Sequence, residues 1–358
     1  MIFSILKRVI MNLKRPLKIL HIADMHLRHL GRLFYSTGRK ISLGFIKNNI
    51  NLLQLGDRDL LSGTLFNRNS FLYDAIKKSI INFKPDIILF GHVDKLDYKD
   101  FTCLKEEFKN IIFCQYFVDT LDKNFTNFEK HKSRFLSKSQ FCDINFITTN
   151  PFDLEFVDLN NTFYLPNIVD SSIDYLKNFN YSSLPYDVFF ALSHGQHRGV
   201  LKSNYIDERE DFIKYVKSRI KKTLFFGIDG VLPVWGSDFF DALSKSKMGI
   251  NYSRGSPQKY YSSDRIASIM GNGLMCFLQK KYSFEDFFIQ DKEAVFFDSK
   301  QELVSKIKFY LANDNLRKKI GKKGHEKYHS LFNSTLVTKY MLSKILGIKI
   351  SKKKTWMI

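Results

Sequence analysis

Side chains able to bind metal ions or act on phosphates gather where the first apolar run of this sequence ends. The stretch KILHIADMHLRHLG, residues 18–31, leads from apolar residues into Asp24 and His26. Asp59 closes a GDRD sequence further on, and His92 closes a GH pair after another apolar run. Carboxylates and imidazoles placed together are the ligands of paired catalytic metal ions. The first hypothesis to weigh is therefore a two-metal hydrolase.

The start of this pattern resembles calcineurin-like metallophosphoesterases, which use D-x-H, G-D-x-x-D, G-N-H-[DE] and a late G-H-x-H. The chain has the first element as DMH, but Leu60 stands where the second aspartate is required. GHVD at 91–94 replaces the third element, and HGQH at 194–197 replaces the fourth. Because metal sites depend on a full ligand set, the phosphoesterase is kept only as an alternative.

Composition indicates a folded, strongly basic chain. The 358 residues are 44% hydrophobic and 15% aromatic, and 56 Lys and Arg outnumber 36 Asp and Glu to give a net charge of +20. Such a surface attracts nucleic acid, anionic membrane or phosphate-bearing substrates. Without a zinc spacing or a base-reading motif we expect no nucleic-acid partner. Four separated cysteines without C-x-x-C indicate free thiols in a reducing compartment, and we expect a cytoplasmic location.

No stretch of the sequence has the continuous apolar length of a membrane span. The first 18 residues, MIFSILKRVIMNLKRPLK, are too interrupted by Lys and Arg for a signal peptide. They read either as an amphipathic segment at a membrane surface or as an extension upstream of a start at Met11. Peripheral contact with the inner face of a membrane is compatible with the first reading.

Strand and helix patterns alternate along almost the whole chain. Apolar runs such as PDIILFGH and NIIFCQYF are separated by amphipathic segments such as SFLYDAIKKSIINF. This alternation predicts parallel sheets covered on both faces. It restarts after a Ser-, Asn- and Asp-rich stretch near 170–185, which predicts two doubly wound α/β domains. We place them at 1–175 and 176–340, with a helical tail at 341–358 that packs back on the first.

The second half carries two basic loops, each following a predicted strand. The first, GQHRGVLK, contains Gly195, Arg198 and Lys202; the second contains Arg254, Gly255 and Lys259, followed by a helix-capping sequence, Ser262, Ser263 and Asp264. Glycines permit close backbone approach, while Arg and Lys together can hold a diphosphate. Ligands of doubly wound sheets bind at the carboxyl ends of strands. A solvent-facing basic turn and an ordinary helix cap are the alternatives at the two loops.

These motifs resemble GT-B glycosyltransferases, specifically the glycosyl transferases group 1 type related to CgeB-like proteins. The helix DRIASIMGNGLMCFL, the tail LRKKIGKKGHEKYHSLF and the loop of Arg198 and Lys202 carry the resemblance. FKPDIILFGHVD and GRKISLGFIKNNINLLQLG resemble the acceptor-domain strands of the same proteins more loosely. The resemblance implies two facing Rossmann-like domains with an interdomain cleft, a nucleotide-sugar donor, and no required metal or other cofactor.

The resemblance also implies roles for individual residues. The diphosphate would be bound by Arg198, Lys202, Arg254, Gly255 and Lys259. The nucleotide or sugar would contact Gly195, Ser262, Ser263, Asp264, Arg265, Ser268 and Asn272. Catalysis would fall to His92, Asp24 and His26 in the first domain. The family's ribose-binding Glu is replaced by Ser268, so that contact passes to Asp264 or Asn272 or is made differently.

The sequence as a whole predicts transfer of a sugar from a nucleotide-diphosphate donor to a glycan or lipid-linked acceptor. Surface polysaccharide or lipopolysaccharide synthesis is the expected context. Two alternatives stay open at this point: the metal phosphoesterase, and a GT-B-shaped protein that binds a nucleotide or glycan without catalysis. The Ser268 substitution keeps the second of these alternatives open.

Overall fold

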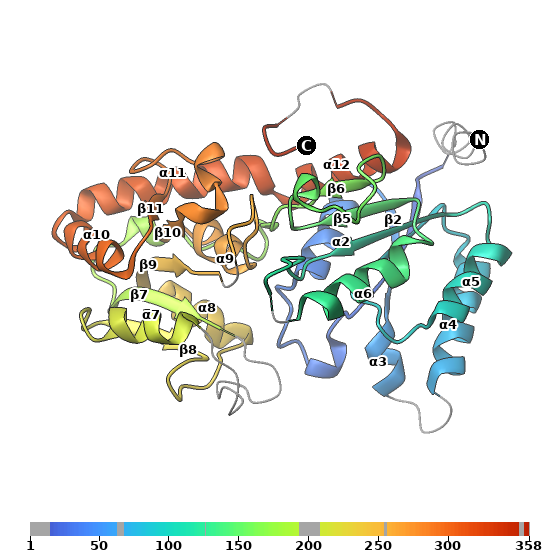
Figure 1. The fold of residues 1–358 in the computed structure, drawn as a ribbon, viewed down its shortest axis with the longest axis horizontal. Coiled ribbons are helices and arrows are strands. Elements are labelled where there is room, and N and C mark those ends of the chain that lie inside the picture. Colours follow the sequence, from blue (N-terminus) through green and yellow to red (C-terminus); the bar gives the residue numbers. More distant parts are fainter. Residues whose placement is uncertain are drawn as a thin grey trace. The chain divides into compact units, whose positions relative to one another are not determined.

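The chain folds into two compact units, each built on its own parallel sheet (Figure 1). The computed structural model describes residues 15–62, 68–125, 127–192, 208–253, 256–350 and 354–357. The first unit takes its residues from 1–166 and 334–358, and the second spans 167–333. Within the described residues, no helix combines the length and apolar character needed to cross a membrane.

The first unit contains a six-stranded sheet of order β2-β1-β3-β4-β5-β6, with every pair parallel. Its central strands are buried apolar runs, as expected where helices cover both faces. The strands are β1 (Lys18–Ala23), β2 (Asn51–Gly56), β3 (Ile87–Phe90), β4 (Ile112–Phe117), β5 (Ile144–Ile147) and β6 (Thr162–Tyr164). The helices are α2 (Thr37–Lys47), α3 (Asp57–Ser62), α4 (Arg68–Phe83), α5 (Tyr98–Glu107), α6 (Phe128–Ser139) and α12 (Ser334–Leu346).

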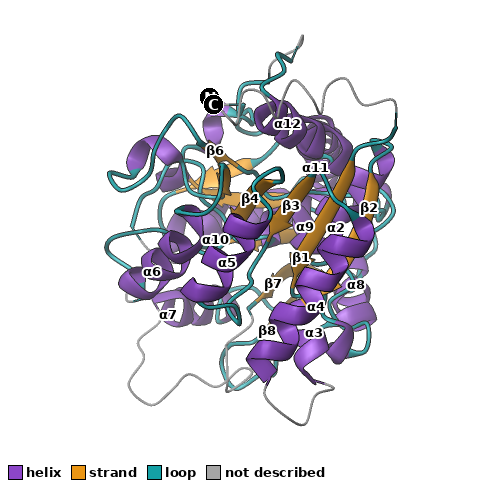
Figure 2. Ribbon diagram, turned by 90° about the vertical axis from the view of Figure 1, so that its right-hand side faces the viewer, coloured by secondary structure: helices purple, strands orange, loops and turns teal. Residues whose placement is uncertain are grey.

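Alternate residues of the first sheet face two different helix layers. Leu20, Ile88 and Phe113 pack into a core shared with α3, α4 and α5. His21 points to the other layer, where its imidazole meets Ser42 of α2 at 2.9 Å and Tyr116 of β4 at 3.1 Å. Figure 2 shows α2 beside β1 and β2. The sheet is thus doubly wound, as the sequence predicts.

The second unit has a five-stranded sheet of order β11-β10-β9-β7-β8, also parallel throughout. Its strands are β7 (Tyr186–Ala191), β8 (Thr223–Phe226), β9 (Ser246–Asn251), β10 (Met275–Gln279) and β11 (Val295–Phe297). Its helices are α7 (Glu208–Lys217), α8 (Gly236–Ser244), α9 (Arg265–Gly271), α10 (Lys300–Ala312) and α11 (Asp314–Phe332).

The glycine-containing tail motif of α11 is explained by packing. Arg317 is 1% exposed and donates to the carbonyls of Lys247 and Tyr181 while pairing with Asp314 at 2.8 Å. A Cβ at Gly324 would clash with the Glu293 carbonyl oxygen, so a larger residue does not fit without movement. The motif therefore holds α11 against the sheet of the second unit.

The unit boundaries fall at 166/167 and 333/334, earlier than the expected 175/176 and 340/341. The reason is that the polar stretch taken as a linker packs on the second unit, where the Asn178 side chain donates to the Leu243 and Ser246 carbonyls. At the other boundary, α12 begins at Ser334 and lies against α2. Gly44 allows this approach, because a Cβ there would clash with the Ser334 carbonyl oxygen.

Candidate functional site

The two basic loops of the second unit leave its sheet at neighbouring strand ends. β7 and β9 are adjacent and parallel, so the segments after Ala191 and after Asn251 start from the same edge. This is the edge at which doubly wound sheets bind ligands. Gly195, Arg198, Lys202, Arg254 and Gly255 lie outside the described residues, so only the strand ends that lead into them are placed.

Arg265, the first residue of α9, ties these two strand ends together. Its Nε donates to the Ala191 carbonyl at 2.7 Å and its Nη1 donates to the Tyr252 carbonyl at 3.2 Å. Its guanidinium also lies over the Phe190 ring, 4.6 Å from the centroid. Burial lowers the pKa of Arg265 to about 9, which leaves the group charged at neutral pH. Arg265 thus positions the starts of both predicted diphosphate loops.

Ser262 and Ser263 are engaged within the protein. Asn251 donates to the Ser262 hydroxyl at 2.8 Å, and that hydroxyl donates to the Ser263 carbonyl at 2.8 Å. Asn167 donates to the Ser262 carbonyl at 2.9 Å. These bonds fix the chain as it enters α9 from the end of β9. The Ser262 hydroxyl therefore stabilises the conformation of the segment between β9 and α9.

Ser268 and Asn272 are both buried in the second unit. The Asn272 side chain donates to the Ser268 carbonyl at 2.8 Å and accepts from the Leu176 N–H at 3.2 Å. A further contact of 3.4 Å joins it to Asp174. Its amide is therefore used in anchoring the 174–178 segment to α9. Both the side-chain oxygen and the side-chain nitrogen of Asn272 thus make hydrogen bonds within the protein.

Asp264 and Lys259 are the exposed members of the predicted set. Asp264 occupies the N-cap position of α9, yet its side chain makes no capping hydrogen bond. Lys259 is 46% exposed, with its Nζ 3.3 Å from Asp286. The Asp286 carboxylate also accepts from the Tyr260 hydroxyl at 2.7 Å. Of the described residues in the predicted set, these two present charged groups to solvent.

In the first unit, Asp24 follows β1 and is held by two arginines. Arg28 donates to both of its oxygens, at 2.6 and 2.8 Å, and Arg58 donates to Oδ2 at 3.2 Å. Burial acts to raise the pKa of Asp24, but Arg28 and His26 outweigh it and keep the pKa below its usual value. Asp24 therefore stays ionised, and both of its carboxylate oxygens already accept hydrogen bonds from guanidinium groups.

His26 lies next to Asp24 in a left-handed backbone conformation, with φ of 62°. Its backbone N–H donates to Asp24 Oδ1 at 3.1 Å, and its Nδ1 lies 3.2 Å from the same oxygen without the alignment of a hydrogen bond. The side chain is 21% exposed. Burial lowers the pKa of His26 below 6.5, so the ring is neutral at physiological pH. A neutral imidazole beside a carboxylate can accept a proton, because the carboxylate stabilises the charged ring.

His92, two residues after β3, has a different hydrogen-bond state. Arg134 donates to its Nδ1 at 2.8 Å, and a guanidinium cannot accept, so the proton of the neutral ring must sit on Nε2. Burial lowers the pKa of His92 to about 4. Nε2 is buried and has no hydrogen-bond partner among the described residues. In this state His92 is a hydrogen-bond donor.

A chain of alternating charges, which no sequence motif indicates, crosses this edge of the first sheet. Arg58 donates to Asp94 at 2.6 and 2.7 Å as well as to Asp24, and Arg134 pairs with Asp119 at 2.9 Å and lies 3.9 Å from Asp94. We call this set the charge ladder; it consists of Arg28, Asp24, Arg58, Asp94, Arg134 and Asp119. Five of its six members lie within five residues after the end of a strand, and the sixth, Arg134, lies in α6.

Asp57 lies beside the charge ladder without belonging to it. It begins α3 and is fully buried, and neither carboxylate oxygen meets a hydrogen-bond partner among the described residues. Burial raises its pKa from 3.8 to about 6 against the opposing effect of Arg58. No cluster of three or more His, Cys, Asp or Glu side chains with metal-binding geometry occurs in the described part of the chain.

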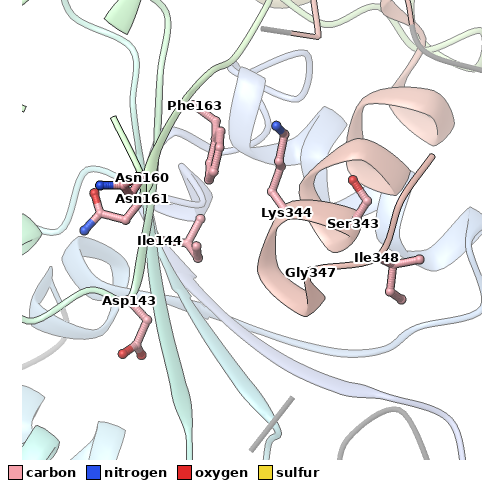
Figure 3. A pocket seen from close by; sticks show the side chains of 9 residues that line it. All are labelled: Asp143, Ile144, Asn160, Asn161, Phe163, Ser343, Lys344, Gly347 and Ile348. Carbon is pink, nitrogen blue, oxygen red and sulfur yellow. The ribbon is translucent and has the colours of Figure 1, made fainter. Parts of the chain in front are cut away.

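A pocket of about 490 Å³ lies elsewhere in the first unit, at the opposite, amino-terminal edge of β5 and β6. Figure 3 shows Asp143, Ile144 and Phe163 across from the end of α12. The Lys344 ammonium sits 4.2 Å from the Phe163 ring centroid. None of the predicted site residues lines this pocket.

Comparison with known proteins gives one family match and several structural matches. Residues 209–343 match the family model described as "Glycosyl transferase-like". No curated protein matches the sequence.

The structural matches extend over nearly the whole chain at low identity. Sucrose-phosphate synthase of Thermosynechococcus elongatus aligns with a TM-score of 0.62 and 10% identity, covering 91% of this chain and 98% of that one. An alpha-glucosyltransferase solved with UDP-glucose and DNA containing an abasic site aligns with a TM-score of 0.64 and 14% identity, covering 92% of this chain and 98% of that one. Anabaena Alr3699/HepE in complex with UDP and glucose aligns with a TM-score of 0.55 and 9% identity, covering 92% of this chain and 100% of that one. At such identities the likeness establishes the fold.

Proposed function

We propose that the chain is a nucleotide-sugar-dependent glycosyltransferase, on the premise that residues 209–343 match the glycosyl transferase-like family model and that the fold resembles solved glycosyltransferase structures. The acceptor is a hydroxyl of a glycan or of a lipid-linked sugar, in the synthesis of a surface polysaccharide or lipopolysaccharide. The donor diphosphate binds to the second unit, and catalytic groups of the first unit act on the acceptor.

The observation that carries this proposal is the position of Arg265. It bonds to the last carbonyl of β7 and to the Tyr252 carbonyl beyond β9, and the two basic loops follow directly. Arg198, Lys202 and Arg254 lie outside the described residues, and the proposal assigns them, with Lys259, to the donor diphosphate. Arg and Lys suit a diphosphate because one offers a planar fork of donors and the other a compact charge.

The reaction follows from these charges. The acceptor oxygen forms a bond to the anomeric carbon of the donor sugar while the bond from that carbon to the phosphate oxygen breaks. The electron pair leaves with the nucleoside diphosphate, whose growing negative charge is stabilised by the basic loops. The acceptor hydroxyl must lose its proton during the same step. In this proposal the cationic side chains of the basic loops, rather than a metal ion, neutralise the negative charge of the leaving diphosphate.

We assign proton removal to His26. Its Nδ1 is buried and faces Asp24 at 3.2 Å, so Nε2 is the nitrogen that takes the proton. Asp24 stabilises the ring once it is charged, and the Arg28 contacts keep Asp24 ionised. His92 is not assigned this role, because its Nδ1 already accepts from Arg134 and its Nε2–H is buried. Replacing His26 by Gln should lower kcat by roughly a hundredfold or more while leaving nucleotide binding unchanged.

We assign the ribose contact to Asp264. Its carboxylate is exposed and makes no capping bond, whereas the Asn272 amide is used within the fold. An ionised carboxylate can accept from both ribose hydroxyls. Asp264→Asn should therefore reduce the preference for a ribonucleoside diphosphate over its 2′-deoxy counterpart. Equal preference in the variant and the native protein would assign ribose recognition to another group.

Thermal unfolding with a panel of nucleoside diphosphates tests the donor site. A ligand at a hundred times its Kd stabilises the folded state by about 2.7 kcal/mol, equal to roughly 5–10 °C in Tm for a unit of this size. Arg198→Ala and Lys202→Ala should remove most of this shift. Lys221→Ala, which changes an exposed lysine before β8, serves as the matched control. Absence of a shift with every diphosphate would refute the donor site.

Turnover distinguishes the alternatives. Release of nucleoside diphosphate that depends on an added glycan acceptor supports the transferase. A diphosphate-dependent Tm shift with no turnover on any acceptor would leave a nucleotide-binding protein without catalysis. Metal-dependent cleavage of a phosphodiester would instead favour the phosphoesterase. That activity would require a metal ion to compete with Arg28 and Arg58 for the Asp24 carboxylate.

A further inference from the structure

The loop after β1 exposes large apolar side chains at its tip. Leu27 is 71% exposed, Leu30 is 94% exposed and Phe34 is 42% exposed, all within eight residues. Leu30 also adopts a left-handed backbone, with φ of 51°. A branched apolar residue in that conformation is unfavourable, and its exposure to water adds to the cost. Such a combination points to a function outside the folded core.

The sequence around this tip carries only basic charge. From residue 25 to residue 56 it contains no Asp or Glu. Arg32 and Arg39 are exposed within this segment, and His29 lies at its 3₁₀ turn. An apolar tip flanked by arginines matches the interface of an anionic bilayer, where the leucines enter the headgroup region and the arginines meet lipid phosphates.

The base of the loop is held firmly, so the tip is presented in a fixed way. Arg28 donates to Asp24 through Nη1 and Nη2, and its backbone N–H donates to Asp59 at 2.9 Å. The charge of Arg28 is thus used inside the protein, while those of Arg32 and Arg39 face outward. A pre-ordered apolar tip loses little conformational freedom on binding.

We propose that residues 27–34, here called the β1 loop, insert into an anionic membrane surface. The proposal deepens the proposed function, on which it rests for its purpose: it brings His26 to the level of a lipid-linked acceptor. The partner is the lipid surface itself, independent of donor binding, so the two proposals fail separately. The exposed leucines enter the headgroup region, and Arg32 and Arg39 give the protein its preference for anionic lipid.

Sedimentation of the full chain with vesicles tests the proposal. Vesicles containing phosphatidylglycerol should bind the native protein, and pure phosphatidylcholine vesicles should bind it weakly. Leu27→Ser with Leu30→Ser should lower the partition coefficient by roughly tenfold for each leucine. Arg32→Gln and Arg39→Gln should each lower it by roughly fivefold. Leu232→Ser, which changes a 66% exposed leucine of the second unit, is the matched control and should bind as the native protein does.

A second measurement locates the inserted residue. Leu30→Trp should show a blue-shifted emission with anionic vesicles, and lipids brominated near the headgroup should quench it. Unchanged vesicle binding by the double serine variant would overturn the proposal, as would an unshifted emission spectrum from a Leu30→Trp variant that does bind. Tm values equal to the native value would show that these surface variants are folded. Transfer to a water-soluble acceptor should be retained by all of them.

Discussion

Asp57 predicts an unusual response of stability to pH. Its carboxyl is buried without a hydrogen-bond partner among the described residues, and burial raises its pKa from 3.8 to about 6. A raised carboxyl pKa means that the folded state prefers the neutral form. The associated stability is fully present below pH 3.8 and is lost as the pH rises through 6. The difference of about two pKa units corresponds to about 3 kcal/mol at neutral pH.

Asp57→Asn removes the charge and keeps the shape of the side chain. The variant should gain stability over the native protein between about pH 4 and pH 7.5, with the gain growing by up to about 3 kcal/mol across that range. Urea unfolding at a series of pH values measures it. Asp94→Asn is the control of opposite sign: burial raises the Asp94 pKa, but Arg58 outweighs burial and lowers it, so that variant should lose stability at neutral pH.

The sign of the Asp57 effect decides whether the reasoning holds. An Asp57→Asn variant that is less stable at about pH 7.5, or that differs from the native protein by the same amount at every pH, would refute it. Either result would mean that the Asp57 carboxylate has a favourable partner in the folded state. A more stable but inactive variant would add that the charge is retained for function.

Three further predictions concern other parts of the molecule. Arg265→Lys should lower the free energy of unfolding by about 1–3 kcal/mol, because a single nitrogen replaces the separate Nε and Nη1 that reach the Ala191 and Tyr252 carbonyls. It should also reduce the diphosphate-induced Tm shift in the same thermal assay. Gly44→Ala should cost roughly 1–3 kcal/mol in urea unfolding, because the new Cβ meets the Ser334 carbonyl. Transfer that depends on neutral His26 should fall as the pH drops through the lowered pKa of that group, below 6.5, in a rate–pH profile with saturating donor.

The sheets were predictable because buried parallel strands read as continuous apolar runs. PDIILFGH and NIIFCQYF correspond to β3 and β4, and their parallel pairing follows from the intervening helix α5. The unit boundary was harder, since a polar stretch reads as a linker whether or not it packs. Asn178 shows why: its partners, the carbonyls of Leu243 and Ser246, lie more than sixty residues away.

The candidate site was predictable only in part, for a related reason. Position after a strand identified Asp24, His26 and His92 as residues of one sheet edge, and β1 and β3 are indeed adjacent. The pairing of Arg58 with Asp94 was not predictable, because it joins residues 36 apart through the sheet order. Asn272 was predicted to contact the nucleotide, but its side chain bonds to Leu176 and Ser268 instead. An Asn at the end of a helix looks the same in the sequence in both cases.

The charge ladder also bears on which unit takes the donor. The three arginines and three aspartates of the charge ladder neutralise one another, so the ladder itself offers little net positive charge to a diphosphate. Ionised Asp57 would shift the balance further toward negative. The two basic loops of the second unit, by contrast, contain no acidic residue between 195 and 202 or between 254 and 259. This difference in charge supports the proposal that the anionic donor binds to the second unit and that the neutral acceptor hydroxyl binds to the first.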